Sequence, residues 1–354
     1  MSRFFSEKYA ALTPYTPGEQ PRDQQYVKLN TNESPFPPSE KAQQYAAQEA
    51  AKLRLYSDPT CDALVKKAAA HWGVAEDELL FTNGSDEILN FAFMAFCDAA
   101  HPAVFPNISY GFYPVFAAVN SVPFTQIPLA ADFTVRVEDY IAAKGTVFLA
   151  NPNAPTGAAL SRAQLERIVA SDSDRVVVID EAYVDFGAES CLPLVHRYDN
   201  LLVTQTFSKS RSLAGGRLGV GIGCRELIRD LNTIKYSTNP YNVNRMTMAA
   251  GVGALEDEAY TQANCREIVR VRESTAAALK ALGFSMPASA ANFLFVKHPA
   301  LAGMEVYKKL KEKGVLIRHF ETPLLRDYNR VTVGSAEQME IFLAKIKEVL
   351  EEAQ

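Results

Sequence analysis

The chain has 354 residues, 48% of them hydrophobic, and a formal net charge of −5 built from both signs. This length fits one large or two moderate domains and leaves ample chain to bury a core. The mixed charge argues against a nucleic-acid-binding surface, and no apolar run reaches the roughly 18 residues of a membrane span.

The cysteines and histidines are scattered along the chain. There are five of each, with no C-x-x-C pair and no metal-ligand spacing. This pattern predicts free thiols in a reducing compartment and no metal site. The first ten residues mix charged and aromatic side chains and lack the apolar core of a signal peptide. We therefore expect a cytoplasmic protein.

The N-terminal region is predicted to be irregular before it becomes helical. Prolines and a glycine interrupt residues 1–28, and a polar run follows from Leu29 to Pro35. Composition alone does not distinguish that run from a solvated loop. Helices are predicted from Ser39 to about Leu53 and again from Asp58 onward.

From residue 79, short apolar strands alternate with helices, a pattern typical of an α/β fold with a parallel sheet. The predicted strands are Leu79–Phe81, Ala103–Phe105, Val122–Ile127, Thr146–Leu149, Arg175–Ile179, Leu201–Val203 and Val220–Gly223. A long, bent helical region is predicted from about Glu256 to Leu282. After it, short strands and an amphipathic helix from Ala336 are typical of a smaller α+β domain. The sequence thus predicts a large domain over residues 30–243 and a small domain formed by residues 1–29 and 244–354.

Two polar segments follow predicted strands and carry alternative interpretations. Asn83-Gly84-Ser85-Asp86-Glu87 either binds a phosphate through the free N–H groups of a helix N-terminus, or is an ordinary helix cap made by Ser85. Asp180 ends a β-branched strand, at the edge where α/β sheets bind ligands. Its alternative role is to cap its own loop.

The segment Thr204–Gly219 places Lys209 among hydroxyls and glycines, with Arg217 eight positions further on. A lysine that forms an imine with a phosphorylated aldehyde must be partly desolvated, so that its amine can be neutral. Hydroxyl and guanidinium donors would hold the phosphate, and glycines would let backbone approach it closely. The alternative is a polar surface loop that ends in a glycine-rich turn.

In order and spacing, these motifs resemble the fold-type I pyridoxal-phosphate aminotransferases, and within them the histidinol-phosphate aminotransferase family. The resemblance covers nearly the whole chain. The segments that carry it are Leu12-Thr13-Pro14-Tyr15, Leu29-Asn30-Thr31-Asn32-Glu33, Tyr56-Ser57-Asp58-Pro59, Asn83-Gly84-Ser85-Asp86-Glu87, Ser109-Tyr110-Gly111-Phe112-Tyr113, Pro155-Thr156-Gly157, Asp180-Glu181-Ala182-Tyr183, Ser208-Lys209 through Arg217, and Arg330-Val331-Thr332-Val333-Gly334. It implies a large domain with a mostly parallel, seven-stranded-type sheet covered by helices, a smaller α+β domain, pyridoxal 5′-phosphate as cofactor, and a homodimer.

The resemblance also implies which residues do the chemistry. Lys209 resembles the lysine that holds the cofactor covalently and later shuttles a proton. Asp180 resembles the carboxylate that keeps the pyridine nitrogen protonated. Tyr183 would donate a hydrogen bond to the ring O3′. Tyr110 would stack on the ring face, its alternative being an ordinary core or surface aromatic.

The cofactor phosphate has its own implied set of residues. By resemblance, it would be held by Gly84, by the backbone N–H groups of Ser85 and Asp86, by the hydroxyls of Ser208 and Thr206, by Arg217, and by Tyr56 of the neighbouring subunit. The alternative for Tyr56 is that it packs within its own domain.

Two arginines suit anionic groups of the substrates. Arg330 resembles the arginine that grips an α-carboxylate, a bidentate task for a planar guanidinium, and Asn32 would assist it. Arg318 resembles a residue that binds a distal phosphate group of the substrate. Tyr15 would close over the same phosphate group. The alternative for Arg318 is a solvated arginine at a strand end.

One position departs from the family pattern. Related enzymes usually have Asn before Pro-Thr-Gly, where its amide hydrogen-bonds the ring O3′, whereas this chain has Ala154. Asn151 or Asn153 could compensate. Without that hydrogen bond, we expect a higher pKa for the lysine–cofactor imine and an upward shift of the pH optimum, because the O3′ oxyanion bears more charge near the imine.

The resemblance implies ping-pong transamination, in which histidinol phosphate and 2-oxoglutarate interconvert with imidazole acetol phosphate and glutamate. The alternatives on the same scaffold are an aromatic amino-acid aminotransferase, a phosphothreonine-type decarboxylase that releases CO2, and a cofactor-binding regulator without catalysis. The regulator is disfavoured because no basic DNA-binding domain fits before Asn30. The expected partners are amino and 2-oxo acids, one of them phosphorylated, with no nucleic acid and no membrane.

Overall fold

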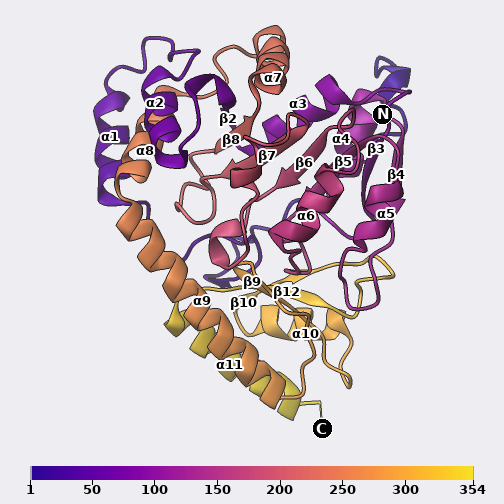
Figure 1. Cartoon of the computed structure of the whole chain (residues 1–354). Helices are drawn as coiled ribbons and strands as arrows, with labels where there is room; N and C mark the ends of the chain where they lie inside the picture. The colour runs from indigo at the N-terminus through magenta and orange to yellow at the C-terminus, as the bar shows by residue number, and fades with distance from the viewer. Residues whose placement is uncertain (1, 354) are drawn as a thin grey trace.

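The computed structural model describes residues 2–353 and is built on a seven-stranded sheet (Figure 1). The strand order is β2-β8-β7-β6-β5-β3-β4. The strands are β2 (Leu79–Asn83), β3 (Ala103–Pro106), β4 (Phe124–Ile127), β5 (Thr146–Ala150), β6 (Val177–Asp180), β7 (Leu201–Thr206) and β8 (Leu218–Gly223). β8 runs antiparallel to both β2 and β7, and the other neighbouring pairs are parallel. The predicted α/β fold class is confirmed.

Helices cover both faces of this sheet. They are α1 (Glu40–Ala50), α2 (Asp62–Trp72), α3 (Ser85–Phe96), α4 (Tyr113–Asn120), α5 (Val137–Ala142), α6 (Arg162–Val169), α7 (Arg225–Thr238) and α8 (Arg245–Glu256). Side chains alternate along each strand, so neighbouring residues enter different cores. Val177 and Ile179 pack in the core shared with α2, α5, α6 and α8, whereas Val178 packs with α3, α4 and α7. Both faces are thus buried, which explains the continuous apolar runs of the strands.

The long helical region predicted from about Glu256 to Leu282 is confirmed as one helix, which begins two residues later and ends one residue earlier. Because Asp257 leaves the helical conformation (φ −119°, ψ 50°), the preceding helix α8 ends at Glu256 and α9 (Glu258–Ala281) is a separate helix. The 24 residues of α9 span about 36 Å, and Figure 1 shows them running from α8 toward the C-terminal part of the chain. α8 itself packs against α1 and α2, beside the large sheet. The domain boundary at residues 243/244 stays a prediction.

The C-terminal part has its own sheets and core. β9 (Phe293–Val296), β12 (Asn329–Thr332) and β11 (Arg318–His319) form an antiparallel sheet. β1 (Val27–Lys28) pairs in parallel with β10 (Val315–Leu316), and Leu29 joins the core formed with α9, α10 (Gly303–Glu312) and α11 (Ala336–Glu351). Short 3₁₀ turns lie at Glu7–Tyr9, Glu76–Glu78, Val184–Phe186 and Leu192–Leu194. The segment around residues 27–29 is therefore attached to the C-terminal part.

The sheet topology gathers the polar segments at one edge. β2, β3, β5, β6 and β7 all end at this edge, because β2 and β7 are both antiparallel to β8 and hence parallel to each other. Antiparallel β8 begins there, just after Arg217. Ligands of α/β sheets bind at this carboxyl edge. No helix within residues 2–353 is long and apolar enough to cross a lipid bilayer.

Candidate active site

A cavity of about 610 Å³ lies at the carboxyl edge of the large sheet. Its lining includes these residues that the sequence singled out: Tyr15, Asn32, Ser85, Asp86, Tyr110, Asp180, Tyr183, Thr206, Ser208, Lys209, Arg217, Arg318 and Arg330. They come from loops far apart in sequence, and the strand ends bring them together. The residues described contain no group of three or more side chains placed to hold a metal ion.

Lys209 follows β7 and faces this cavity. Its Nζ donates a 3.2 Å hydrogen bond to the carbonyl of Thr31 and lies 5.8 Å from the centre of the Tyr183 ring. Burial, with help from the nearby Arg330, lowers the pKa of Lys209 to about 8, although the carboxylates of Glu33 and Asp86 oppose the shift. Near neutral pH, a useful fraction of the amine is neutral and nucleophilic.

The N-terminus of α3 is open toward the cavity. Gly84, with φ +76°, takes the N-cap position, and Ser85 is the first helical residue, not the cap. A Cβ on Gly84 would lie 2.3 Å from Nη2 of Arg217, and one on Gly219 would lie 2.4 Å from the backbone N of Ser85. Only glycine permits such an approach of β8 and Arg217 to the helix end. The capping alternative for Ser85 is therefore wrong, and the first N–H groups of α3 are available to an anion.

Arg217 completes this corner of the cavity. Its Nη2 donates to Oδ2 of Asp86 at 3.0 Å, and the Tyr110 hydroxyl donates to Oδ1 of the same carboxylate at 2.6 Å. The hydroxyls of Thr206 and Ser208 are 3.0 Å apart in the same lining. A guanidinium, two hydroxyls and a helix N-terminus fit a phosphate group.

Asp180 is buried at the end of β6. Its carboxylate accepts hydrogen bonds from the backbone N of Ala182 at 3.2 Å and from the hydroxyls of Tyr113 and Thr204 at 3.4 Å each. It thus caps its own loop and also lines the cavity. None of these partners carries a positive charge, and burial raises the pKa of Asp180 to about 6. A buried carboxylate without a cation fits the protonated nitrogen of a pyridine ring.

Tyr183 lies beside Asn32 at the other side of Lys209. Nδ2 of Asn32 donates to the Tyr183 hydroxyl at 3.0 Å. Asn32 has φ +56°, a conformation held by hydrogen bonds of its backbone N–H and side chain with the Thr332 hydroxyl at 2.9 and 3.1 Å. Burial raises the pKa of the Tyr183 phenol, so the phenol remains a proton donor at neutral pH.

Arg330 presents an unsatisfied donor. Its Nη2 donates to the carbonyl of Asn30 at 3.0 Å, while its buried Nε has no hydrogen-bond partner among residues 2–353. Its guanidinium lies 5.3 Å from the Phe293 ring, and burial lowers its pKa. A half-buried guanidinium with a buried, unpaired Nε and no carboxylate partner favours an anionic ligand.

Arg318 is bound to the N-terminal arm, defined here as residues 15–19. Its guanidinium donates to the carbonyls of Thr16 and Pro17 at 3.0 Å each. Tyr15 stacks on Phe112 with ring centres 4.2 Å apart. Arg318 is therefore not a freely solvated strand-end residue, and the arm lies along the cavity between Phe112 and Arg318.

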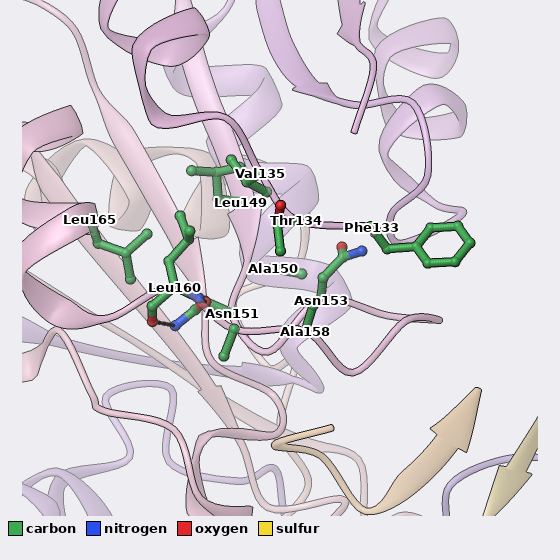
Figure 2. A pocket seen from close by; sticks show the side chains of 11 residues that line it. Phe133, Thr134, Val135, Leu149, Ala150, Asn151, Asn153, Ala158, Leu160 and Leu165 are labelled. Atoms are coloured by element: carbon green, nitrogen blue, oxygen red, sulfur yellow. Dashed lines mark hydrogen bonds between the residues drawn. The ribbon is translucent and has the colours of Figure 1, made fainter. Parts of the chain in front are cut away.

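Ala154 is buried, and the two neighbouring asparagines point elsewhere. Asn153 Nδ2 donates to the Ile108 carbonyl at 3.0 Å and to Thr156 Oγ1 at 3.1 Å, and Asn151 exchanges hydrogen bonds of 2.7 and 3.2 Å with the backbone of Leu160 (Figure 2). The side chains drawn in Figure 2 line a small cavity. Its volume is about 20 Å³, which is room for roughly one water. Neither amide is free to replace an asparagine at position 154.

Tyr56 is not brought to the cavity of its own subunit. Its side chain is 81% exposed and stacks on Tyr241 with ring centres 4.7 Å apart. The stacking on Tyr241 agrees with the alternative that Tyr56 packs against its own domain, and the role of Tyr56 in a neighbouring subunit stays a prediction.

Several residues that hydrogen-bond the functional side chains of the cavity were not named as site residues from the sequence. Tyr113 and Thr204 hydrogen-bond Asp180, and Thr31 accepts from Lys209. Thr204 stands two positions before Thr206 in β7, so period-2 alternation could have placed both on one face. Nothing in the sequence marked Phe320, Thr322, Leu324 and Leu325, which line the cavity together with Arg318.

The chain matches the family model described as "Aminotransferase class I and II" over residues 24–346. It belongs to this family. A histidinol-phosphate aminotransferase of Brachyspira hyodysenteriae is 46% identical to it over 352 residues, covering 99% of both chains. One of Acinetobacter baylyi is 45% identical over 349 residues, covering 98% of this chain and 97% of that protein.

Solved structures agree on the fold of this aminotransferase. The crystal structure of histidinol-phosphate aminotransferase from Sinorhizobium meliloti, in complex with pyridoxal 5′-phosphate, matches it with a TM-score of 0.91 at 23% identity, covering 100% of this chain and 99% of that one. The enzyme from Clostridium acetobutylicum matches with a TM-score of 0.85 at 21% identity, covering 92% and 99%. The aminotransferase is a pyridoxal-phosphate-dependent transaminase of fold type I, as predicted.

Proposed function

We propose that this aminotransferase interconverts histidinol phosphate and 2-oxoglutarate with imidazole acetol phosphate and glutamate. The observation that carries the proposal is the pair Arg330 and Arg318 in one cavity with Lys209. Glutamate carries two carboxylates and histidinol phosphate carries a phosphate, so each half-reaction presents an anion that a guanidinium can bind. The 46% identity to a full-length histidinol-phosphate aminotransferase supports the same substrates.

The residues present fit the cofactor at three points. The open end of α3, Ser208, Thr206 and Arg217 would hold its phosphate, Asp180 its ring nitrogen, and Lys209 its aldehyde carbon. When bound, the cofactor supplies an electron-poor ring that stabilises negative charge at the substrate α-carbon.

The chain's own groups then move one proton and orient the substrate. Lys209 Nζ, with a pKa of about 8, would take the proton from the substrate α-carbon and pass it to the former aldehyde carbon of the cofactor, and it would carry a proton the opposite way in the second half-reaction. Asp180 remains ionised against the ring nitrogen. Tyr183, oriented by Asn32, donates its hydroxyl proton toward the ring O3′. Arg330 fixes the substrate anion so that the α-carbon lies near Lys209.

The test is a spectroscopic titration of the holoenzyme with single substrates. We expect histidinol phosphate and glutamate each to convert the cofactor fully to its amino form, with half-saturation at least tenfold below that of tyrosine or phenylalanine. A preference for the aromatic amino acids would contradict the proposal, and release of CO2 instead of a 2-oxo acid would indicate a decarboxylase.

We further propose that the enzyme is a homodimer in which Tyr56 of each subunit completes the site of the other. Tyr56 stacks on Tyr241, and Leu53, Leu55 and Tyr236 are exposed on neighbouring stretches of the chain, where the five residues, 44–81% exposed, would form one apolar patch. Such a patch is typical of an interface. Light scattering should give twice the chain mass, and Tyr56→Phe should weaken cofactor retention without changing that mass.

A cytoplasmic location is also part of the proposal. All five cysteines are buried and free, in keeping with a reducing compartment. Cell fractionation with a tagged full-length chain tests it, and recovery in an oxidising compartment would contradict it.

A further inference from the structure

The segment Lys28–Ser34 is attached to the lysine-bearing loop at two points. Lys209 Nζ donates to the Thr31 carbonyl at 3.2 Å, and the Ser212 hydroxyl donates to the Ser34 hydroxyl at 2.8 Å. Ser212, three residues after Lys209, has φ +58°, so the loop is held in a conformation that few side chains adopt unaided. The position of the Thr31 carbonyl therefore determines whether the Lys209 amine can make this hydrogen bond.

Thr31 is fixed in turn by an ion pair. Lys28 and Glu33 form a short salt bridge, Lys28 Nζ donates to Thr31 Oγ1 at 3.0 Å, and Thr31 Oγ1 donates to Glu33 Oε2 at 2.6 Å. The two charged side chains are 34% and 43% exposed, so solvent screens them only in part. Lys28 lies in β1, whose pairing with β10 anchors the whole arrangement to the C-terminal part of the chain.

The charges that face Lys209 are unequally distributed. Arg330 from β12 and Arg217 from the start of β8 disfavour its ammonium form. Glu33 and Asp86 favour that form, the latter from α3. Asp86 already accepts from Arg217 and Tyr110, whereas Glu33 is balanced by Lys28 alone among the basic side chains bonded to it in residues 2–353. Burial raises the pKa of Glu33, but the hydrogen bonds from Lys28 and Thr31 outweigh it and keep Glu33 ionised.

We propose that Lys28 and Glu33 are positioning residues for Lys209: they hold the Thr31 carbonyl against Nζ, and their net field sets how readily that amine carries a proton. The inference rests on the proposed role of Lys209. An amine that must both accept and return a proton works best when its pKa lies near the working pH. The two arginines lower the pKa of Lys209, and the negative charge of Glu33 would raise it again. The positive charge of Lys28 would limit the effect of Glu33.

The test uses the full chain in its cofactor-free form. Competitive labelling with acetic anhydride across pH, read by peptide mass spectrometry at Lys209, gives the pKa of that amine without substrate or cofactor. Glu33→Gln should lower this pKa by about half a unit or more, because it removes an attractive charge and leaves Lys28 unpaired. Lys28→Met should raise it, because Glu33 then acts on Lys209 unopposed.

The opposite signs of the two pKa shifts separate this proposal from simple loosening of the loop. Loosening would shift the pKa of Lys209 in the same direction in both variants. Asp62→Asn and Lys66→Met provide a matched control, since they break an exposed ion pair on α2 away from the cavity. Shifts of equal sign in the two variants, or shifts no larger than in the control, would overturn the proposal. Borohydride reduction of the holoenzyme followed by peptide mapping tests cofactor attachment at Lys209 separately, so failure of the proposed function gives a different result.

Discussion

The hydroxyl of Tyr113 lies 3.4 Å from the carboxylate of Asp180, at the buried end of the central strand β6. Thr204 approaches the other carboxylate oxygen at the same distance, from the neighbouring strand β7. Asp180 is therefore held by neutral groups and faces the cavity with its negative charge unbalanced. This arrangement orients the carboxylate for a cationic ring nitrogen, and it makes Asp180 costly to ionise when no such ring is present.

Asp180→Asn should lower kcat/KM by roughly 10²–10³-fold, because a preorganised charge is lost from the reacting centre. Steady-state assays with histidinol phosphate and with glutamate measure the loss. Tyr113→Phe is the control: it removes one long hydrogen bond and keeps the charge, so its effect should stay within about tenfold. Equal losses in the two variants would show that packing and not charge is at work.

The cofactor-free protein should lose stability as pH rises. The folded pKa of Asp180 is raised to about 6 by burial, above its unfolded value of about 3.8. The folded state therefore binds the proton more tightly, and this contribution to stability is complete below pH 4 and lost as pH rises through 6. At 1.36 kcal/mol for each pKa unit, the difference is on the order of 1–3 kcal/mol. Urea unfolding from pH 4 to 8 should show this fall in the native chain and a flatter profile in Asp180→Asn.

Arg330→Lys should raise KM for glutamate and for histidinol phosphate, with kcat/KM down by roughly 10–100-fold, because a lysine cannot replace a bidentate guanidinium. Arg318→Lys should lower kcat/KM for glutamate, which carries a second carboxylate, and for histidinol phosphate, whose phosphate carries up to two charges, but leave phenylalanine nearly unchanged, since phenylalanine carries a single carboxylate charge. A similar loss for all three substrates would place Arg318 in a general structural role.

Arg211 should stabilise the fold through its contact with α9. It is buried, donates to Glu258 Oε2 at 2.8 Å, and lies 3.2 Å from Nε2 of His71. Arg211→Met should lower the free energy of unfolding by about 1–3 kcal/mol; the partial exposure of Glu258 reduces the effect from that of a fully buried pair. Arg197→Met breaks the pair with Glu166 in which Arg197 is 60% exposed, and it should cost less than about 1 kcal/mol in the same urea titration.

Ala154→Asn should lower the pH at which the absorbance of the bound cofactor titrates. Asn151 and Asn153 are engaged with the loop backbone and with Thr156, so an amide at position 154 would add a new donor toward the ring O3′ and favour its charged form. A spectrophotometric pH titration of both holoenzymes measures the difference. An unchanged or higher midpoint in the variant would contradict the expectation.

The sequence by itself determined the fold class and the composition of the site. Apolar runs and helix signals specified the inner strands of the large sheet, because burial on both faces demands continuous β-branched and apolar residues, whereas the edge strand β4 is mostly exposed. Local chemistry also singled out Lys209, Asp180 and Arg217, which stand at a strand end or in a segment with hydroxyls and glycines, where period and turn signals are informative. Arg330 was selected only by its resemblance to the family pattern.

Only the tertiary structure decided how these groups act on one another. The strand order brings Arg217 to the end of α3, an approach that the sequence signals only as two glycines. The separation of α8 from α9 at Asp257, the binding of Arg318 to the arm, and the engagement of Asn151 and Asn153 with their own loop are likewise absent from local patterns. Such features depend on contacts between residues tens to hundreds of positions apart. Propensity and periodicity carry no information about those contacts, because they describe only the neighbours along the chain.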